Sequence, residues 1–328
     1  MFTHPLPITR YRFTARVQQP LALPDYAGSL LRGQFGAALR QVACMTRAPA
    51  CPGCPLIQTC PYTRIFEAPP PPKGQHALQD FSQIPNPFVM EPPTPGARVL
   101  DADDDFAFNI VLIGHATEQL ALVIYALQRA LGRGLTRARV PVDLLQVDWV
   151  DAQGQSHPIW WMEQPTLQEH PTTILMPEFA HDAAVNTPDA PITLHIDTPL
   201  RLQHQGQPLG IGQLGPHALI AAIARRTTLL MEFHAGQTGW GDAAKHIVQL
   251  SSTLTDTQDL HWFDWTRYSS RQQQKMTLGG VLGRWTLHGS QATMAEIWPW
   301  LWLGQWLHVG KNATMGMGGY RLEHKPSA

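Results

Sequence analysis

The stretch FAFNIVLIG at residues 106–114, followed by TEQLALVIYALQRALGR at residues 117–133, decides the fold of the first half of the chain. The first segment is short and almost wholly apolar, which is typical of a central strand. The second segment repeats its apolar side chains at helical spacing, which predicts a helix. Residues 140–150 then predict another strand. This order of strand, helix and strand indicates a helix packed on a sheet.

The same order extends outward and occurs twice. Residues 10–23 predict a strand and residues 26–44 a helix before the quoted stretch. In the second half we expect a strand, a helix, one or two strands, a helix and a last short strand at residues 192–202, 216–234, 276–287, 292–309 and 319–323. Two copies of this split βαβ order predict an α+β protein with tandem ferredoxin-like (RRM-like) domains. We place the domains at residues 1–155 and 190–328, with a connector rich in Trp, Pro and His at residues 156–189.

Composition narrows the function classes. The chain has 328 residues, 15% of them charged, and a formal net charge of -1, which excludes a uniformly basic nucleic-acid binder but not a locally basic one. No apolar run reaches the roughly 18 residues that a membrane span needs. No secretory signal is apparent. We therefore expect a cytoplasmic protein with no membrane partner.

The four cysteines of the chain are Cys44, Cys51, Cys54 and Cys60, all within one short window. Cys51 and Cys54 form a C-x2-C knuckle, and four thiolates at this spacing can close a tetrahedral shell around Zn²⁺. The alternatives are an iron–sulfur cluster, two disulfides, which the absence of a secretory signal disfavours, or four unrelated thiols. A shell of four thiolates leaves no open coordination position, so we predict a structural zinc ion that stabilises an insertion at about residues 44–66, the cysteine insertion.

The run GKNATMGMGG at residues 310–319, the glycine loop, combines four glycines with one lysine. Successive exposed N–H groups in such a loop can form an anion-binding concavity, and a lysine adds a positive charge. The alternative is a plain tight turn. We predict that the loop binds a phosphate-like anion through Gly310, Lys311, Thr314, Gly316, Gly318 and Gly319.

Basic residues also gather where acids are absent. No acidic residue occurs between Glu118 and Asp143 or between Asp264 and Glu296. Such stretches suit contact with a phosphate backbone, although solvated helix faces would look the same. The candidate phosphate-binding residues in them are Arg133, Arg137, Arg139, Arg267, Arg271 and Lys275.

Three segments together resemble a known family. They are YSSRQ at residues 268–272, LGGVLG at residues 278–283 and HVGKNATMGMGGY at residues 308–320. They resemble the C-terminal half of CRISPR-associated (Cas) family six, the RAMP-superfamily endoribonucleases that process precursor CRISPR RNA. LRGQFGAALR at residues 31–40, with the cysteine insertion, and LIGHA at residues 112–116 are similar to one branch of that family.

The resemblance implies that the glycine loop and these basic residues bind CRISPR repeat RNA, and that the RNA is cleaved without a catalytic metal. The 2′-OH attacks the adjacent phosphate and leaves a 2′,3′-cyclic phosphate and a 5′-OH end. An alternative function is a catalytically inactive subunit that holds crRNA within a Cas effector complex. A zinc hydrolase is a third possibility.

The sequence departs from the family at the catalytic histidine. Ala37 stands where some relatives carry a histidine, and the first helix has none. We expect the first and third strands of the half to run parallel, which would bring His115, at the start of the second helix, near Tyr26 and Arg32 of the first. A histidine with a pKa near 6.5 can act as base or acid. We therefore predict His115, Tyr26 and Arg32 as catalytic residues, although His115 could instead only pack or cap its helix.

Overall fold

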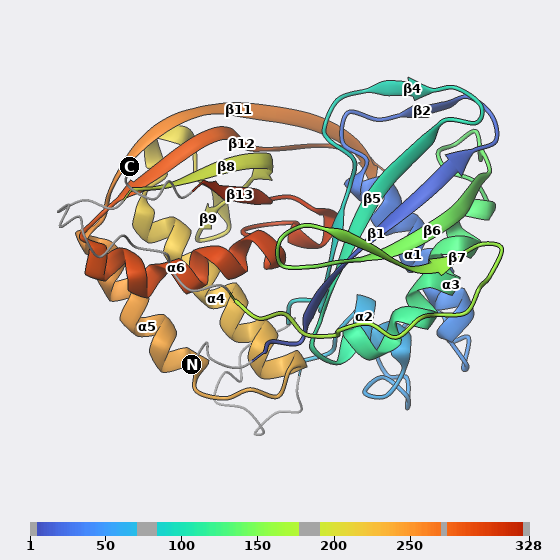
Figure 1. Cartoon of the computed structure of the whole chain (residues 1–328), viewed down its shortest axis with the longest axis horizontal. Coiled ribbons are helices and arrows are strands. Elements are labelled where there is room, and N and C mark those ends of the chain that lie inside the picture. The colour runs from blue at the N-terminus through green and yellow to red at the C-terminus, as the bar shows by residue number, and fades with distance from the viewer. Residues whose placement is uncertain (1–4, 71–83, 177–190, 270–273, 324–328) are drawn as a thin grey trace. The chain divides into compact units, whose positions relative to one another are not determined.

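The computed structural model describes residues 5–70, 84–176, 191–269 and 274–323 (Figure 1). The chain divides into two compact units. The N-terminal unit contains residues 6–174 together with residues 229–237. The C-terminal unit contains the described residues of 175–228 and those from 238 onward.

The N-terminal unit is built on a five-stranded sheet with the order β3-β5-β1-β6-β7. Its strands are β1 (Ile8–Val17), β3 (Phe88–Glu91), β5 (Asp105–Ile113), β6 (Val142–Val150) and β7 (Ser156–Trp161). Helices α1 (Gly28–Ala43) and α3 (Leu120–Gly132) pack against each other (Figure 1). The short helix α2 (Pro61–Phe66) contacts both α1 and the 3-10 helix η1 (Gly114–Gln119). Strands β2 (Leu21–Leu23) and β4 (Arg98–Leu100) pair separately.

The alternation of side chains along β1 explains how this sheet packs. Tyr11, Phe13 and Ala15 are buried, whereas Arg12 and Arg16 are exposed. Successive side chains of a strand point to opposite faces, so one face of β1 can join the core while the other stays polar. The buried face of β1 belongs to one core cluster with Leu31, Phe35 and Leu39 of α1 and Val123, Ile124 and Leu127 of α3.

Strands β1 and β5 run antiparallel, with Ile8 opposite Ile113. The expectation that the first and third strands are parallel is therefore wrong. Strand β5 is inserted between β1 and β3 and is antiparallel to both. The end of β5, which leads to His115, consequently lies beside the start of β1, at the opposite end of the strand pair from the residues that lead into α1.

The C-terminal unit has a four-stranded sheet with the order β11-β12-β8-β13. Its strands are β8 (Ile192–Leu200), β11 (Thr255–Ser269), β12 (Gln274–His288) and β13 (Tyr320–Glu323). Its helices are α4 (Pro216–His234), α5 (Trp240–Leu250) and α6 (Gln291–Leu307), and the last turns of α4 belong to the N-terminal unit. Short elements are the hairpin β9 (Gln203–His204) and β10 (Gln207–Pro208) and the 3-10 turns η2 (Ile211–Gln213), η3 (Ser251–Thr253) and η4 (Ala313–Met315).

Both sheets have the strand order of the ferredoxin-like fold. In each, the third strand of the split βαβ pattern lies between the second and the first, and the fourth lies beyond the first. The predicted fold class is confirmed. Trp298, Trp302 and Trp306 of α6 are buried, as expected for a stripe of core side chains.

Several elements lie where the sequence did not place them, among them β3, β7, β11 and α5. Ser156–Trp161, in the expected connector, forms β7 and pairs with β6. Thr255–Ser269 forms β11, a strand as long as its partner β12. The hairpin of β11 and β12 is the longest pairing in its sheet.

Candidate functional site

His115 lies in η1, directly after the central strand β5. The preceding residue, Gly114, has φ +58, and a Cβ there would overlap the backbone carbonyl of His234. Only glycine combines this conformation with so close an approach. The turn therefore brings His115 against the end of α4, where its ring stacks on that of His234 with centroids 5.1 Å apart and an interplanar angle of 15°.

The hydrogen bonds of the two rings differ. The Nε2–H of His234 donates to the carbonyl of Pro85 at 2.6 Å, because a carbonyl can only accept. Nδ1 of His115 is buried and has no hydrogen-bond partner among the described residues. The His115 ring can therefore exchange a proton with a bound molecule only through Nε2.

The surroundings of His115 favour its neutral form. Burial lowers the pKa of His115, and the positive charge of Arg64 lowers it further, while Glu118 opposes the shift. Since the ordinary value is about 6.5, the ring is mostly neutral at pH 7. A neutral imidazole can accept a proton, which is what a general base must do.

Arg64 is a candidate site residue that the sequence analysis missed. It projects from α2, and with Ile65, Gln119 and His115 it lines a small cavity of about 30 Å³. Its side chain is exposed and forms no ion pair within the described parts of the chain. We call Arg64, His115, Gln119 and His234 the His115 site. Arg64 lies beside His115 only because of how the cysteine insertion folds, and no pattern in the sequence indicates this.

The other predicted catalytic residues are held differently. Tyr26 is buried in the core. The guanidinium of Arg32 lies over the ring of Phe66, 4.3 Å from its centroid. The antiparallel pairing of β1 and β5 removes the geometric reason to expect either residue beside His115.

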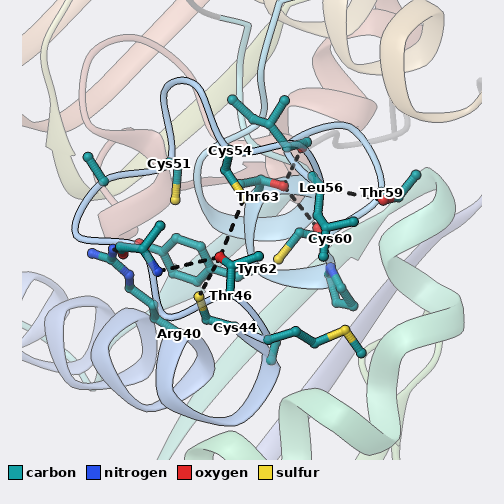
Figure 2. Close-up of a pocket in the computed structure, with 16 residues that line it drawn as sticks. Arg40, Cys44, Thr46, Cys51, Cys54, Leu56, Thr59, Cys60, Tyr62 and Thr63 are labelled. Atoms are coloured by element: carbon teal, nitrogen blue, oxygen red, sulfur yellow. Dashed lines mark hydrogen bonds between the residues drawn. The ribbon is translucent and has the colours of Figure 1, made fainter.

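The four cysteines line one pocket of about 190 Å³ in the cysteine insertion. All four are free thiols and are half-buried. In Figure 2 their sulfur atoms surround the hydroxyl of Thr46, which bonds to the sulfurs of Cys44 and Cys54 at 3.9 and 3.5 Å. The thiols that the sequence predicts as one metal site are therefore brought together.

The pocket is wider than a zinc site. Zn–S bonds of about 2.3 Å would draw the four sulfurs into one compact tetrahedron. Within the described residues, no three histidine, cysteine or acidic side chains are arranged to hold a metal ion as they stand. Burial, together with the carboxylate of Glu67, raises the pKa of Cys51 to about 11. The donor set suits zinc, but binding requires the side chains to move inward and Cys51 to lose its proton.

The glycine loop is folded tightly against β8. The N–H of Lys311 donates to the carbonyl of Arg201 at 2.9 Å, and the N–H of Gly318 donates to that of Pro199 at 3.0 Å. Gly319 donates to the hydroxyl of Thr198 at 2.7 Å, and that hydroxyl donates to the carbonyl of Gly316 at 2.6 Å. Several N–H groups expected to face an anion are thus used inside the protein.

The six residues of the glycine loop that were predicted to contact an anion differ in their exposure to solvent. Gly316, Gly318 and Gly319 are buried, whereas Lys311 is exposed and Gly310 and Thr314 are half-buried. Gly318 has φ +74, and a Cβ there would overlap the carbonyl oxygen of Val309. The buried glycines allow the chain to fold, and Lys311 is the member of the predicted set that the loop exposes most.

The predicted basic residues fall in two places. Arg133, Arg137 and Arg139 are all exposed in the turn after α3. Arg267 and Lys275 lie in β11 and β12, but their side chains are outside the described part of the structure, as is the whole of Arg271.

Comparison with known families covers most of the chain. A family model described as an N-terminal domain (AF_1859_N) matches residues 6–172, and the model of the CRISPR-associated endoribonuclease Cas6 matches residues 194–320. No curated protein matches the sequence.

No helix of the described residues is long and apolar enough to cross a membrane.

Solved structures show the same fold. A Cas6 product complex aligns over 96% of this chain and 99% of its own, with a TM-score of 0.57 and 16% identity. The Cas6 of Thermus thermophilus aligns over 98% of this chain and 99% of its own, with a TM-score of 0.51 and 14% identity. A chain of a partial Cas6-RT-Cas1–Cas2 complex aligns over 98% of this chain and 47% of its own, with a TM-score of 0.56 and 14% identity. Residues 194–320 therefore match the family of the CRISPR-associated endoribonuclease Cas6, and the chain has the fold of the solved Cas6 structures.

Proposed function

We propose that this protein binds CRISPR repeat RNA and cuts precursor crRNA without a catalytic metal. The observation that carries the proposal is His115, a histidine held neutral beside an exposed arginine at the end of the central strand pair. The match of residues 194–320 to the Cas6 endoribonuclease model supports RNA cleavage as the reaction. The similar solved structures include a Cas6 product complex and a complex of Cas6 with other Cas proteins, which supports RNA and Cas subunits as the partners of this chain.

In this mechanism His115 is the general base. Nε2 takes the proton of the 2′-OH, the 2′-oxygen attacks the adjacent phosphorus, and the bond from phosphorus to the 5′-oxygen breaks. The leaving oxygen takes a proton from an acid, and the products carry a 2′,3′-cyclic phosphate and a 5′-OH. A positioned base of this kind contributes about 10²–10⁴ in rate.

The glycine loop serves binding in this proposal. Lys311 is exposed at the turn that follows α6, and Arg133, Arg137 and Arg139 are exposed after α3. Exposed lysine and arginine side chains neutralise backbone phosphates without reading sequence. We therefore assign Lys311 and these arginines to binding of the RNA backbone and His115 to the chemistry.

Cleavage in the presence of a chelator tests the proposed function. Repeat RNA labelled at its 5′ end is incubated with the protein in excess EDTA, and the product ends are examined by mass spectrometry. We expect one main cut that leaves a cyclic phosphate and a 5′-OH. Binding without any cut would instead show an inactive crRNA-binding subunit, and cleavage that requires added metal would contradict the mechanism.

We also propose that Cys44, Cys51, Cys54 and Cys60 hold a structural zinc ion. The support is that four free thiols from separate parts of the cysteine insertion line one pocket. Zinc would add a crosslink to a segment whose only helix has six residues. In this proposal the zinc ion stabilises the cysteine insertion, and no step of the cleavage depends on the metal.

A further inference from the structure

We propose that Arg64, carried by the cysteine insertion, is the cation that stabilises the cleavage transition state beside His115. The inference rests on the proposed function and extends it to a residue that neither the sequence nor the family comparison assigns. Attack of the 2′-oxygen adds negative charge to the phosphate, and a fixed cation at that point lowers the barrier. The first helix lacks a histidine, so a histidine base must come from another element.

The local structure fixes where Arg64 points. Helix α2 begins after Cys60 with Pro61 at its first position, and the N–H of Arg64 donates to the carbonyl of Cys60 at 3.0 Å. Tyr62, Ile65 and Phe66 are buried in the core, while Arg64 is exposed. Thr63 is buried as well, so four of the six residues of α2 face the protein and Arg64 projects from the remaining face.

Buried aromatic contacts hold α2 in place. The ring of Phe66 stacks on those of Tyr62 and Phe88, each with centroids 5.6 Å apart. The hydroxyl of Thr63 donates to the carbonyl of Ile57 at 2.6 Å. Strand β3, which contains Phe88, is hydrogen-bonded to β5, the strand that ends at the His115 site. The same packing therefore positions both Arg64 and His115.

The charges around His115 fit this role. The groups that face it are Arg64 of α2, Glu118 of its own turn and His234 of α4. Arg64 has no acidic partner among the described residues, so its charge is available to a phosphate. The same charge disfavours a second positive charge on His115, which keeps the base unprotonated.

Single-turnover cleavage at saturating protein tests the inference. Arg64→Ala should lower the rate about 100-fold, the effect of removing one transition-state donor, and Arg64→Lys should recover part of it. The dissociation constant of the RNA should change much less than the rate. Arg129→Ala removes an exposed arginine of α3 in the same unit and serves as the matched control, with a rate close to wild type.

A pH profile separates this role from a purely structural one. Removing the Arg64 charge makes protonated His115 less unfavourable, so the pKa of His115 rises. The limb on which the rate falls with decreasing pH should then move to higher pH in Arg64→Ala and stay in place in Arg129→Ala. Thermal melting checks that each variant is folded.

The outcomes can be told apart. A folded Arg64→Ala protein that cleaves at the wild-type rate, or a slowed one whose pH limb does not move, overturns the role of Arg64 alone. A wild-type protein that binds repeat RNA and never cuts overturns the proposed function, and this inference with it.

Discussion

At the scale of single residues, His115 shows what a sequence can and cannot reveal. Its position after an apolar strand singled it out as a candidate base. Its partners could not be found in the same way, because Arg64 and His234 come from an insertion and from a helix of the other half of the chain. The antiparallel pairing of β1 and β5 removes the reason for which the sequence suggested Tyr26 and Arg32 as its partners.

The glycines of the loop were also only partly predictable. Their number indicated a special backbone, and φ values of +85, +84 and +74 at Gly310, Gly316 and Gly318 show one. The sequence could not show that the N–H groups of Lys311, Gly318 and Gly319 would bond to β8 and the residue that follows it. That depends on the pairing of distant segments.

Gly318 provides a test of this structural role. A Cβ there would meet the carbonyl oxygen of Val309 in a left-handed backbone conformation, so Gly318→Ala should destabilise the protein by about 1–3 kcal/mol. Gly33→Ala is the matched control, because Gly33 is exposed in α1 with nothing within 4 Å of its Cβ position. That change should be neutral or stabilising by up to about 1 kcal/mol. Urea unfolding of both variants measures the difference, and equal effects would contradict the account.

At the scale of elements, periodicity predicted the helices α1, α3, α4 and α6 but missed α5, and it predicted the strands less well. The helix at residues 216–234 was predicted with the bounds it has. Strand β11 was missed because its sequence, TDTQDLHWFDWTRYS, mixes charged and aromatic side chains along an edge strand. Strand β7 lay hidden in a segment rich in Trp, Pro and His.

The cysteine insertion is the element on which the zinc proposal depends. Protein purified without chelator should contain about one zinc ion per chain by elemental analysis, as four thiolates fill one tetrahedral site. Removal of the metal should lower the melting temperature by several degrees. Zinc affinity should also weaken as pH falls, because each thiolate, and Cys51 above all, regains its proton.

Substitutions in the insertion provide the control. Cys54→Ser should lose the zinc, whereas Thr59→Ala, which changes another residue of the same pocket, should keep it. Metal-free protein with an unchanged melting temperature would rule out a stabilising zinc ion.

At the scale of the whole molecule, two ferredoxin-like sheets carry different tasks in this account. The repeated strand and helix order made this fold predictable, because each half repeats the same hydrophobic pattern. The repeated order did not indicate which half would cleave RNA and which would bind it. The proposed assignment follows from the local structure, because the His115 site lies in the N-terminal unit and the glycine loop in the C-terminal unit.

The most direct test compares single-turnover cleavage and binding of repeat RNA by His115→Ala and Lys311→Ala. We predict that His115→Ala lowers the rate at saturating protein about 100-fold or more while the dissociation constant stays nearly unchanged. Lys311→Ala should instead weaken binding and reduce its salt dependence by about one phosphate contact, with a saturating rate close to wild type. Cleavage by His115→Ala at the wild-type rate would contradict the central claim that His115 is the general base.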